Sequence, residues 1–116
     1  MYVTLSCAII DADPVNRQEL VTFLSRFGVQ CVAQSGTPET LPALLGRVDA
    51  PQLVIINLDP SAHETLKKIS ALPRQYSSVN FFAMSQVLDP HLLMEAMHLG
   101  IREFIPLPMS EENCTP

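Results

Sequence analysis

The chain has 116 residues, of which 47% are apolar and 16% charged, with a formal net charge of −5. This length suits one compact domain, and the apolar share is too high for an intrinsically disordered chain. An acidic surface repels nucleic acid, and apolar runs such as 53–56 are too short to cross a bilayer, so we expect neither nucleic-acid binding nor membrane insertion.

Cysteine usage and the first residues bear on the cellular compartment. Cys7, Cys31 and Cys114 are odd in number and lack the spacing of a zinc site or a disulfide framework. Cys7 and Cys31 lie inside apolar runs, where cysteine serves as a small core residue. The chain begins without a recognisable secretory signal, and together these features favour a reducing, cytoplasmic location.

The first elements in chain order are a strand and an amphipathic helix. Leu5–Ile10 is a short apolar run of strand length. Asp13 then suits a helix N-cap and Pro14 the first helical position, and Gly28 is expected to end the helix. Apolar residues between them recur at three- and four-residue spacing, which predicts one buried helix face. They are Leu20, Phe23, Leu24 and Phe27.

The middle of the chain alternates in the same way. Val29–Ala33 is predicted as a second, weaker strand, and Leu53–Ile56 as a third strand that is apolar on both faces, as in a buried parallel sheet. Between them, 37–48 predicts a short helix whose start is confined to the neighbourhood of Pro42. Its apolar residues at helical spacing are Leu41, Leu44, Leu45 and Val48.

A third helix and a fourth strand follow. Ser61 with Glu64 three residues later predicts a capping box at the start of a helix. Leu66 and Ile69 give this helix a short apolar stripe. Asn80–Met84 is predicted as the fourth strand.

The last predicted elements repeat the pattern of the first helix. Asp89 and Pro90 predict a helix start and Gly100 its end, and Glu103–Ile105 is predicted as a fifth strand. Three apolar residues at helical spacing are expected to form the core face of this helix. They are Leu93, Met94 and Met97, with the methionines acting as core filler.

Strands thus alternate with helices from end to end. This order predicts an α/β fold, a doubly wound parallel sheet of five strands with helices on both faces. In such sheets the functional site lies beyond the carboxyl ends of the strands. The polar residues expected there are Asp11, Asp13, Asn57, Asp59, Ser85 and Gln86.

Three segments carry a resemblance to a known family. Ala8–Pro14, Leu53–Asn57 and Leu99–Pro108 resemble the framework of response-regulator receiver domains, which are CheY-like. The resemblance runs from about residue 3 to residue 113. It implies a flavodoxin-like sheet in strand order 2-1-3-4-5. Receivers carry a fifth helix after the last strand, and we expect this helix to be short or missing here, because few residues follow Ser110. Residues 1–109 would form the receiver-like domain, and 110–116 the start of a truncated fifth helix or a linker to a following domain.

The residues that receivers use for phosphoryl transfer are largely replaced. The resemblance places two acidic Mg²⁺ ligands after the first strand, a phosphoacceptor aspartate after the third, and a lysine before proline after the fifth. Here Asp11 fills the first acidic position but Ala12 the second, Asn57 fills the acceptor position, and Leu107 the lysine position. Asn57 is not a comparable nucleophile, and Leu107 brings no charge to a phosphoryl group.

Two switch positions and a set of carboxylates remain. Ser85 keeps the hydroxyl position and Phe104 the aromatic position of the resemblance. Asp11, Asp13 and Asp59 form a remnant acidic pocket that offers hard oxygen ligands. We expect no cofactor and no functional metal there. Two alternatives remain: the carboxylates bind a divalent cation weakly, or Asp59 acts as a substitute nucleophile. The simpler roles are an N-cap for Asp13 and a turn for Asp59.

The segment Glu95–Pro108 resembles more specifically the N-terminal atypical receiver of the CpaE/TadZ pilus-assembly proteins. This resemblance implies a phosphorylation-independent, non-enzymatic domain that binds protein partners or a second copy of itself within a Flp-type or type IV pilus assembly and localisation protein. The expected partner surface comprises His91, Glu95, His98, Arg102 and Phe104. The first alternative is a phosphorelay receiver still responsive to phosphorylation or Mg²⁺. Another is a nucleotide-responsive module, against which the lack of a glycine-rich phosphate loop argues.

Overall fold

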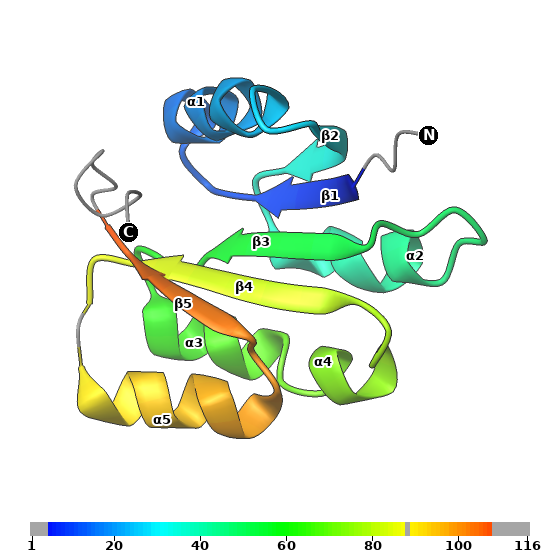
Figure 1. Ribbon diagram of the computed structural model, residues 1–116. Helices are drawn as coiled ribbons and strands as arrows, with labels where there is room; N and C mark the ends of the chain where they lie inside the picture. The colour runs from blue at the N-terminus through cyan, green and yellow to red at the C-terminus, as the bar shows by residue number, and fades with distance from the viewer. Residues whose placement is uncertain (1–4, 88, 108–116) are drawn as a thin grey trace.

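The computed structural model describes residues 5–87 and 89–107. Five parallel strands form one sheet in the order β2-β1-β3-β4-β5 (Figure 1). The strands are β1 (Leu5–Ile10), β2 (Val29–Ser35), β3 (Leu53–Asn57), β4 (Asn80–Ser85) and β5 (Glu103–Pro106). The predicted fold class and strand order are therefore confirmed, and each predicted strand is found with its end moved by no more than two residues.

Helices cover both faces of this sheet. In Figure 1, α1 (Pro14–Ser25) lies on one face, and α3 (Ala62–Lys68) and α5 (Pro90–Leu99) lie on the other. The shorter elements are the 3₁₀ turn Pro38–Thr40, α2 (Leu41–Leu45) and α4 (Leu72–Gln75), of which α4 was not predicted. No helix in the described part of the chain is long and apolar enough to span a membrane. The predicted start of a further helix at 110–116 and the domain boundary at 109 lie outside the described residues.

The core consists of two apolar clusters, one on each side of the sheet. β3 contributes to both, with Val54 and Ile56 in the larger cluster and Leu53 and Ile55 in the smaller. This alternation follows from the two-residue period of a strand, and it explains why the strand is apolar throughout. Each such buried side chain stabilises the fold by about 1.5–3 kcal/mol.

Two predicted helix caps are confirmed. The Asp13 carboxylate accepts hydrogen bonds from the backbone N–H groups of Val15 and Asn16, and Asp89 accepts one from the N–H of His91. Ser61 stands at the N-cap of α3 but makes no capping hydrogen bond with its side chain, so the predicted capping box is wrong.

Glycine marks the ends of two helical segments. Gly28 and Gly100 have φ angles of 76° and 103°, in the left-handed region that favours glycine. A side chain at Gly100 would also place its Cβ 3.1 Å from that of Pro73. Gly100 therefore caps α5 as predicted, whereas α1 already ends at Ser25 with Arg26 as its C-cap, and Gly28 closes the turn that follows.

The predicted core face of α5 is wrong. Leu92 and Ala96 are buried against the sheet, whereas Leu93, Met94 and Met97 are 41%, 62% and 46% exposed. α5 is apolar nearly all round, so helical spacing fits two different faces. Leu92 and Ala96 pack in the larger core cluster together with side chains of the sheet, and this face is the buried one.

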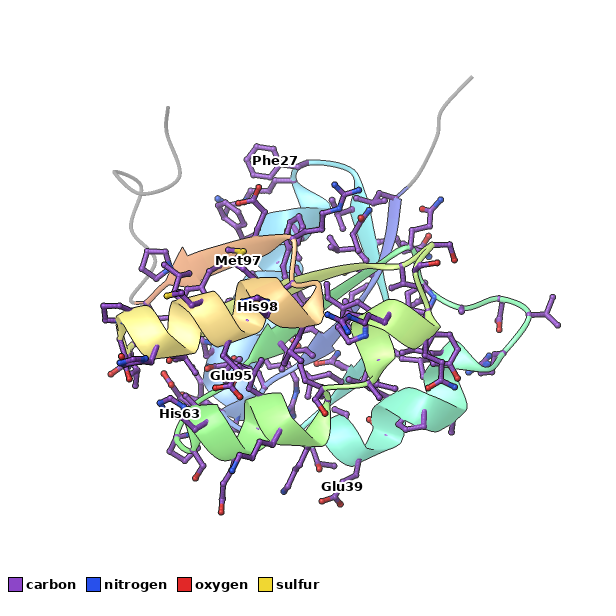
Figure 2. All side chains as sticks on the ribbon, turned by 90° about the horizontal axis from the view of Figure 1, so that it is seen from below. Phe27, Glu39, His63, Glu95, Met97 and His98 are labelled. Carbon is purple, nitrogen blue, oxygen red and sulfur yellow. The ribbon has the colours of Figure 1, made fainter. Side chains whose placement is uncertain are left out.

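Two other apolar residues predicted for the core lie at the surface. Phe27 is 70% exposed, because α1 ends at Ser25 and the following turn directs its ring outward (Figure 2). Its ring centroid lies 5.1 Å from that of Phe23. Val48 is fully exposed, since α2 ends at Leu45 rather than continuing through 48.

Candidate functional site

The carboxyl ends of the strands bring the predicted site residues to one edge of the sheet. Because the strands are parallel, the residues that follow β1, β3, β4 and β5 lie at the same edge. Two depressions flank Asn57 at this edge. The larger, of about 380 Å³, is lined by apolar Leu20, Phe23, Met84 and Leu107 and by polar Asp13, Asn16, Glu19, Asn57 and Gln86.

The smaller depression, of about 210 Å³, lies between the ends of β1 and β3 and the helices on the other face. Ala12, Asp59 and Lys68 are among the residues that line it. The Lys68 ammonium lies 3.6 Å from the carboxylate of Glu39, so its charge is directed toward the surface. Glu39 is labelled in Figure 2, at the outer edge of the molecule.

Asp11 is used to build the turn between β1 and α1. It is 1% exposed, and its two carboxylate oxygens accept hydrogen bonds from the N–H of Asp13 (2.9 Å) and from the side-chain amide of Asn16. The Arg17 guanidinium donates a hydrogen bond of 2.6 Å to the backbone carbonyl of Asp11. Both oxygens of this carboxylate are therefore engaged within the protein.

Asp59 connects the ends of β3 and β4, a contact that the sequence did not indicate. One of its carboxylate oxygens accepts a 2.6 Å hydrogen bond from the Ser85 hydroxyl, and the other accepts a 2.7 Å bond from the N–H of Gln86. The N–H of Asp59 in turn donates to the side-chain oxygen of Asn57 at 3.0 Å. Asp59 is thus more than a turn residue, and Asn57 holds it in place.

The lysine position of the resemblance is occupied by a packed apolar side chain. Leu107 packs against the smaller core cluster, and its N–H donates a 2.9 Å hydrogen bond to the carbonyl of Ser85. The Ser85 side chain is fully buried, and Phe104 is partly buried against the larger cluster. Uncharged Leu107 thus stands where the resemblance places a lysine.

The three carboxylates of the predicted acidic pocket serve separate hydrogen-bond acceptor roles. Asp11 holds the β1–α1 turn, Asp13 caps α1, and Asp59 bridges to Ser85. Within residues 5–87 and 89–107, no group of three or more His, Cys, Asp or Glu side chains is placed to hold a metal ion. The residues share an edge of the sheet without forming one set of ligands.

The predicted partner residues lie around α5 and β5 without sharing a single face. His91 and His98 are exposed on α5, and Phe104 is partly buried in β5. The Arg102 guanidinium, just before β5, donates to the side-chain oxygen of Asn80 at 3.1 Å. Glu95 points toward α3, whereas Met97 lies on the β5 side of the helix (Figure 2).

A polar contact links α3 with α5. His63 lies 3.4 Å from a carboxylate oxygen of Asp89 and 3.7 Å from one of Glu95. The pKa of Asp89 is lowered, chiefly by the hydrogen bond from the N–H of His91, against a smaller opposing effect of burial and with further help from His63. No sequence pattern around His63 indicated this contact.

Comparison with solved structures identifies the fold. A protein named as pilus assembly-related, from Burkholderia pseudomallei, superposes with a TM-score of 0.83 at 15% identity, over 98% of this chain and 87% of that one. A response regulator from Thermotoga maritima gives 0.80 at 16% identity, over 93% and 88% of the two chains. The receiver domain of RcsB from Salmonella enterica gives 0.78 at 18% identity, over 93% and 80%.

No family model and no curated protein matches the sequence. At identities of 15–18% the structural likeness establishes the fold, which is the CheY-like receiver fold.

Proposed function

We propose that this chain is a phosphorylation-independent pseudo-receiver, a non-enzymatic domain that binds other proteins. The contact between Asp59 and the Ser85 hydroxyl is the observation that carries this proposal. The serine that would bind a phosphoryl oxygen already donates its proton to a carboxylate. The acceptor and lysine positions hold Asn57 and Leu107, so both the nucleophile and the cation that would offset developing charge are missing.

The proposed binding surface is the exposed side of α5 together with β5. Leu93, Met94 and Met97 form an exposed apolar ridge on α5. Charged and imidazole side chains flank it, and apolar area with a polar border is the usual composition of a protein interface. His91, Glu95, His98, Arg102 and Phe104 are the residues proposed around this ridge, and its partner is another protein or a second copy of this chain.

We propose that this chain lies in the cytoplasm and acts there in the assembly and localisation of a Flp-type or type IV pilus. Two observations support it. Glu95–Pro108 resembles the atypical receivers of pilus-assembly proteins, and one structural neighbour is itself named as pilus assembly-related. Neither observation depends on the phosphorylation site. The pilus role and the lack of phosphorylation are therefore tested by separate experiments.

Incubation with acetyl phosphate and Mg²⁺, followed by intact-mass spectrometry, tests the pseudo-receiver proposal. We expect no mass increase under conditions that phosphorylate an ordinary receiver domain in the same tube. Stoichiometric addition of a phosphoryl group would overturn the proposal. Light scattering of the wild type and of Met94→Asp then tests the surface, because a charge on the apolar ridge should abolish any self-association.

A phosphorelay receiver that still responds to phosphorylation or Mg²⁺ is the second candidate. Its favouring observation is that the carboxylates of Asp11, Asp13 and Asp59 lie at the same sheet edge as the hydroxyl of Ser85. A weak divalent cation at these carboxylates would appear as Mg²⁺-dependent NMR shifts confined to this edge. Beryllofluoride-dependent shifts that disappear in Asp59→Asn would favour this candidate over the first.

A further inference from the structure

Two hydrogen-bond donors converge at the end of β4. The Ser85 hydroxyl and the backbone N–H of Gln86 both donate to the carboxylate of Asp59, at 2.6 and 2.7 Å. These lengths are those of bonds to an ionised acceptor. The two donors come from successive residues, and each contacts one oxygen of the same carboxylate. Together they form a compact binding site for an oxyanion.

The direction of the Ser85 hydroxyl bond follows from its other contact. The N–H of Val87 donates to the Ser85 oxygen at 3.0 Å. A hydroxyl carries one proton, so with its oxygen accepting from Val87 that proton goes to Asp59. The Ser85 side chain is completely buried, and a buried donor without an acceptor is costly. An acceptor at this place therefore stabilises the fold.

Asp59 is held in position by backbone contacts to the neighbouring strand. The N–H of Leu58 donates to the carbonyl of Met84 at 2.8 Å, and the Leu58 side chain is buried. The N–H of Asp59 donates to the side-chain oxygen of Asn57 at 3.0 Å. The carboxylate is thus preorganised in front of its donors, as an internal ligand would have to be.

We propose that Asp59 is the internal ligand of an oxyanion site made by the Ser85 hydroxyl and the Gln86 N–H. Its occupancy fixes the first residues that lead from β4 toward α5. Removal of the carboxylate leaves a site that takes a small external oxyanion, a carboxylate or a phosphate. The consequence for regulation rests on the proposed function. The Asp59 side chain permanently supplies the negative charge that phosphorylation brings to an ordinary receiver.

Amide hydrogen exchange on Asp59→Ala tests the site directly. With its acceptor gone, the N–H of Gln86 should exchange about tenfold to a hundredfold faster than in the wild type, and the N–H of Val87, which donates to the Ser85 oxygen, should exchange faster by a smaller factor. Acetate or phosphate should restore most of the protection in Asp59→Ala, whereas chloride at equal ionic strength should not. The matched control is Asp49→Ala, which removes an exposed carboxylate paired with Arg47 at 3.0 Å and should change neither amide.

Two further variants keep the test decisive if Asp59→Ala folds poorly. Asp59→Asn retains one acceptor oxygen, so its amides should show intermediate protection. Ser85→Ala combined with Asp59→Ala removes one donor, and the rescue by acetate and phosphate should be lost. Unchanged exchange at Gln86 in both Asp59 variants, or equal rescue by chloride, would overturn the proposal.

The oxyanion site and the pseudo-receiver function fail in different experiments. Phosphorylation of the wild type would end the proposed function while leaving the exchange and rescue results as they stand. Absence of anion rescue would overturn the proposal that Asp59 is an internal ligand. The wild type could still fail to be phosphorylated, but Asp59 would not be the reason.

Discussion

The imidazole of His63 on α3 lies 3.4 Å from a carboxylate oxygen of Asp89, the residue that caps α5. Its other ring nitrogen lies 3.7 Å from a carboxylate oxygen of Glu95, nearly two turns further along the same helix (Figure 2). One side chain therefore joins two carboxylates of α5 to α3. Because the apolar ridge of the proposed interface lies on α5, this contact helps to set how the ridge is presented.

The cap residue Asp89 should make stability depend on pH in acid. Its pKa lies below the ordinary 3.8, because the His91 N–H and the His63 side chain stabilise the carboxylate in the folded state. The unfolded chain therefore binds the proton more tightly, so the stabilisation is present above about 3.8 and is lost as the pH falls below it. We expect Asp89→Asn to be less stable than the wild type at neutral pH, and the difference to shrink in strong acid.

Urea unfolding of both proteins across the acid range measures this difference. Asp49→Asn, which alters an exposed carboxylate that caps no helix, serves as the control and should track the wild type more closely. A gap between Asp89→Asn and the wild type that stayed constant from neutral pH into strong acid would contradict the predicted role of the carboxylate charge.

The two apolar sides of α5 should differ sharply in their contribution to stability. Leu92 is fully buried, so Leu92→Ala should lower the free energy of unfolding by about 2–5 kcal/mol. Met94 is 62% exposed, so Met94→Ala should change it by no more than about 0.5 kcal/mol. Urea unfolding curves measure both values. Equal losses would mean that the exposed ridge is packed against something, such as a second copy of the chain.

Local patterns in the sequence were enough to predict the strands and most helix ends. Apolar runs of strand length identified all five strands, and the caps at Asp13 and Asp89 required only neighbouring residues. The core face of α5 could not be predicted in this way, because Leu93 and Leu92 lie on different sides of a helix that is apolar nearly all round. Which side is buried depends on packing against the sheet, a tertiary property.

The candidate site was predicted in composition but not in its contacts. Comparison of the strand ends with those of receivers is enough to show that Ala12, Asn57 and Leu107 replace residues used for phosphoryl transfer. The bond between Asp59 and Ser85 joins residues 26 apart in the chain, and no periodicity carries information over that distance. Only the geometry of the parallel sheet brings the two loops together.

The thiol of Cys7 should be chemically inert in the folded protein. Burial, followed by the neighbouring Cys31, raises its pKa to about 12. At mildly alkaline pH only about one such thiol in ten thousand is ionised, and the thiolate is the reactive form. In a Cys114→Ser background, a thiol reagent should therefore label Cys31 while the protein is folded, and Cys7 only after unfolding. Modification of both at the same rate would show that the β1–β2 pairing opens readily.

Restoring a carboxylate at the acceptor position should not restore phosphorylation. The side-chain oxygen of Asn57 accepts the N–H of Asp59, and a carboxylate in Asn57→Asp can accept the same bond, so the fold should be retained. Ala12 still provides no second metal ligand, Leu107 brings no cation, and the Ser85 proton is still committed to Asp59. We therefore expect no mass increase on treatment of Asn57→Asp with acetyl phosphate and Mg²⁺.

The double variant Asn57→Asp with Asp59→Ala separates the blocking effect of Asp59 from the other losses. It frees the Ser85 hydroxyl and the Gln86 N–H for an incoming phosphoryl group. Slow labelling of the double variant alone would assign the block to Asp59, whereas no labelling of either would assign it to the missing metal ligand and lysine. Rapid labelling of Asn57→Asp alone would contradict both accounts, since a single carboxylate would then suffice for the chemistry.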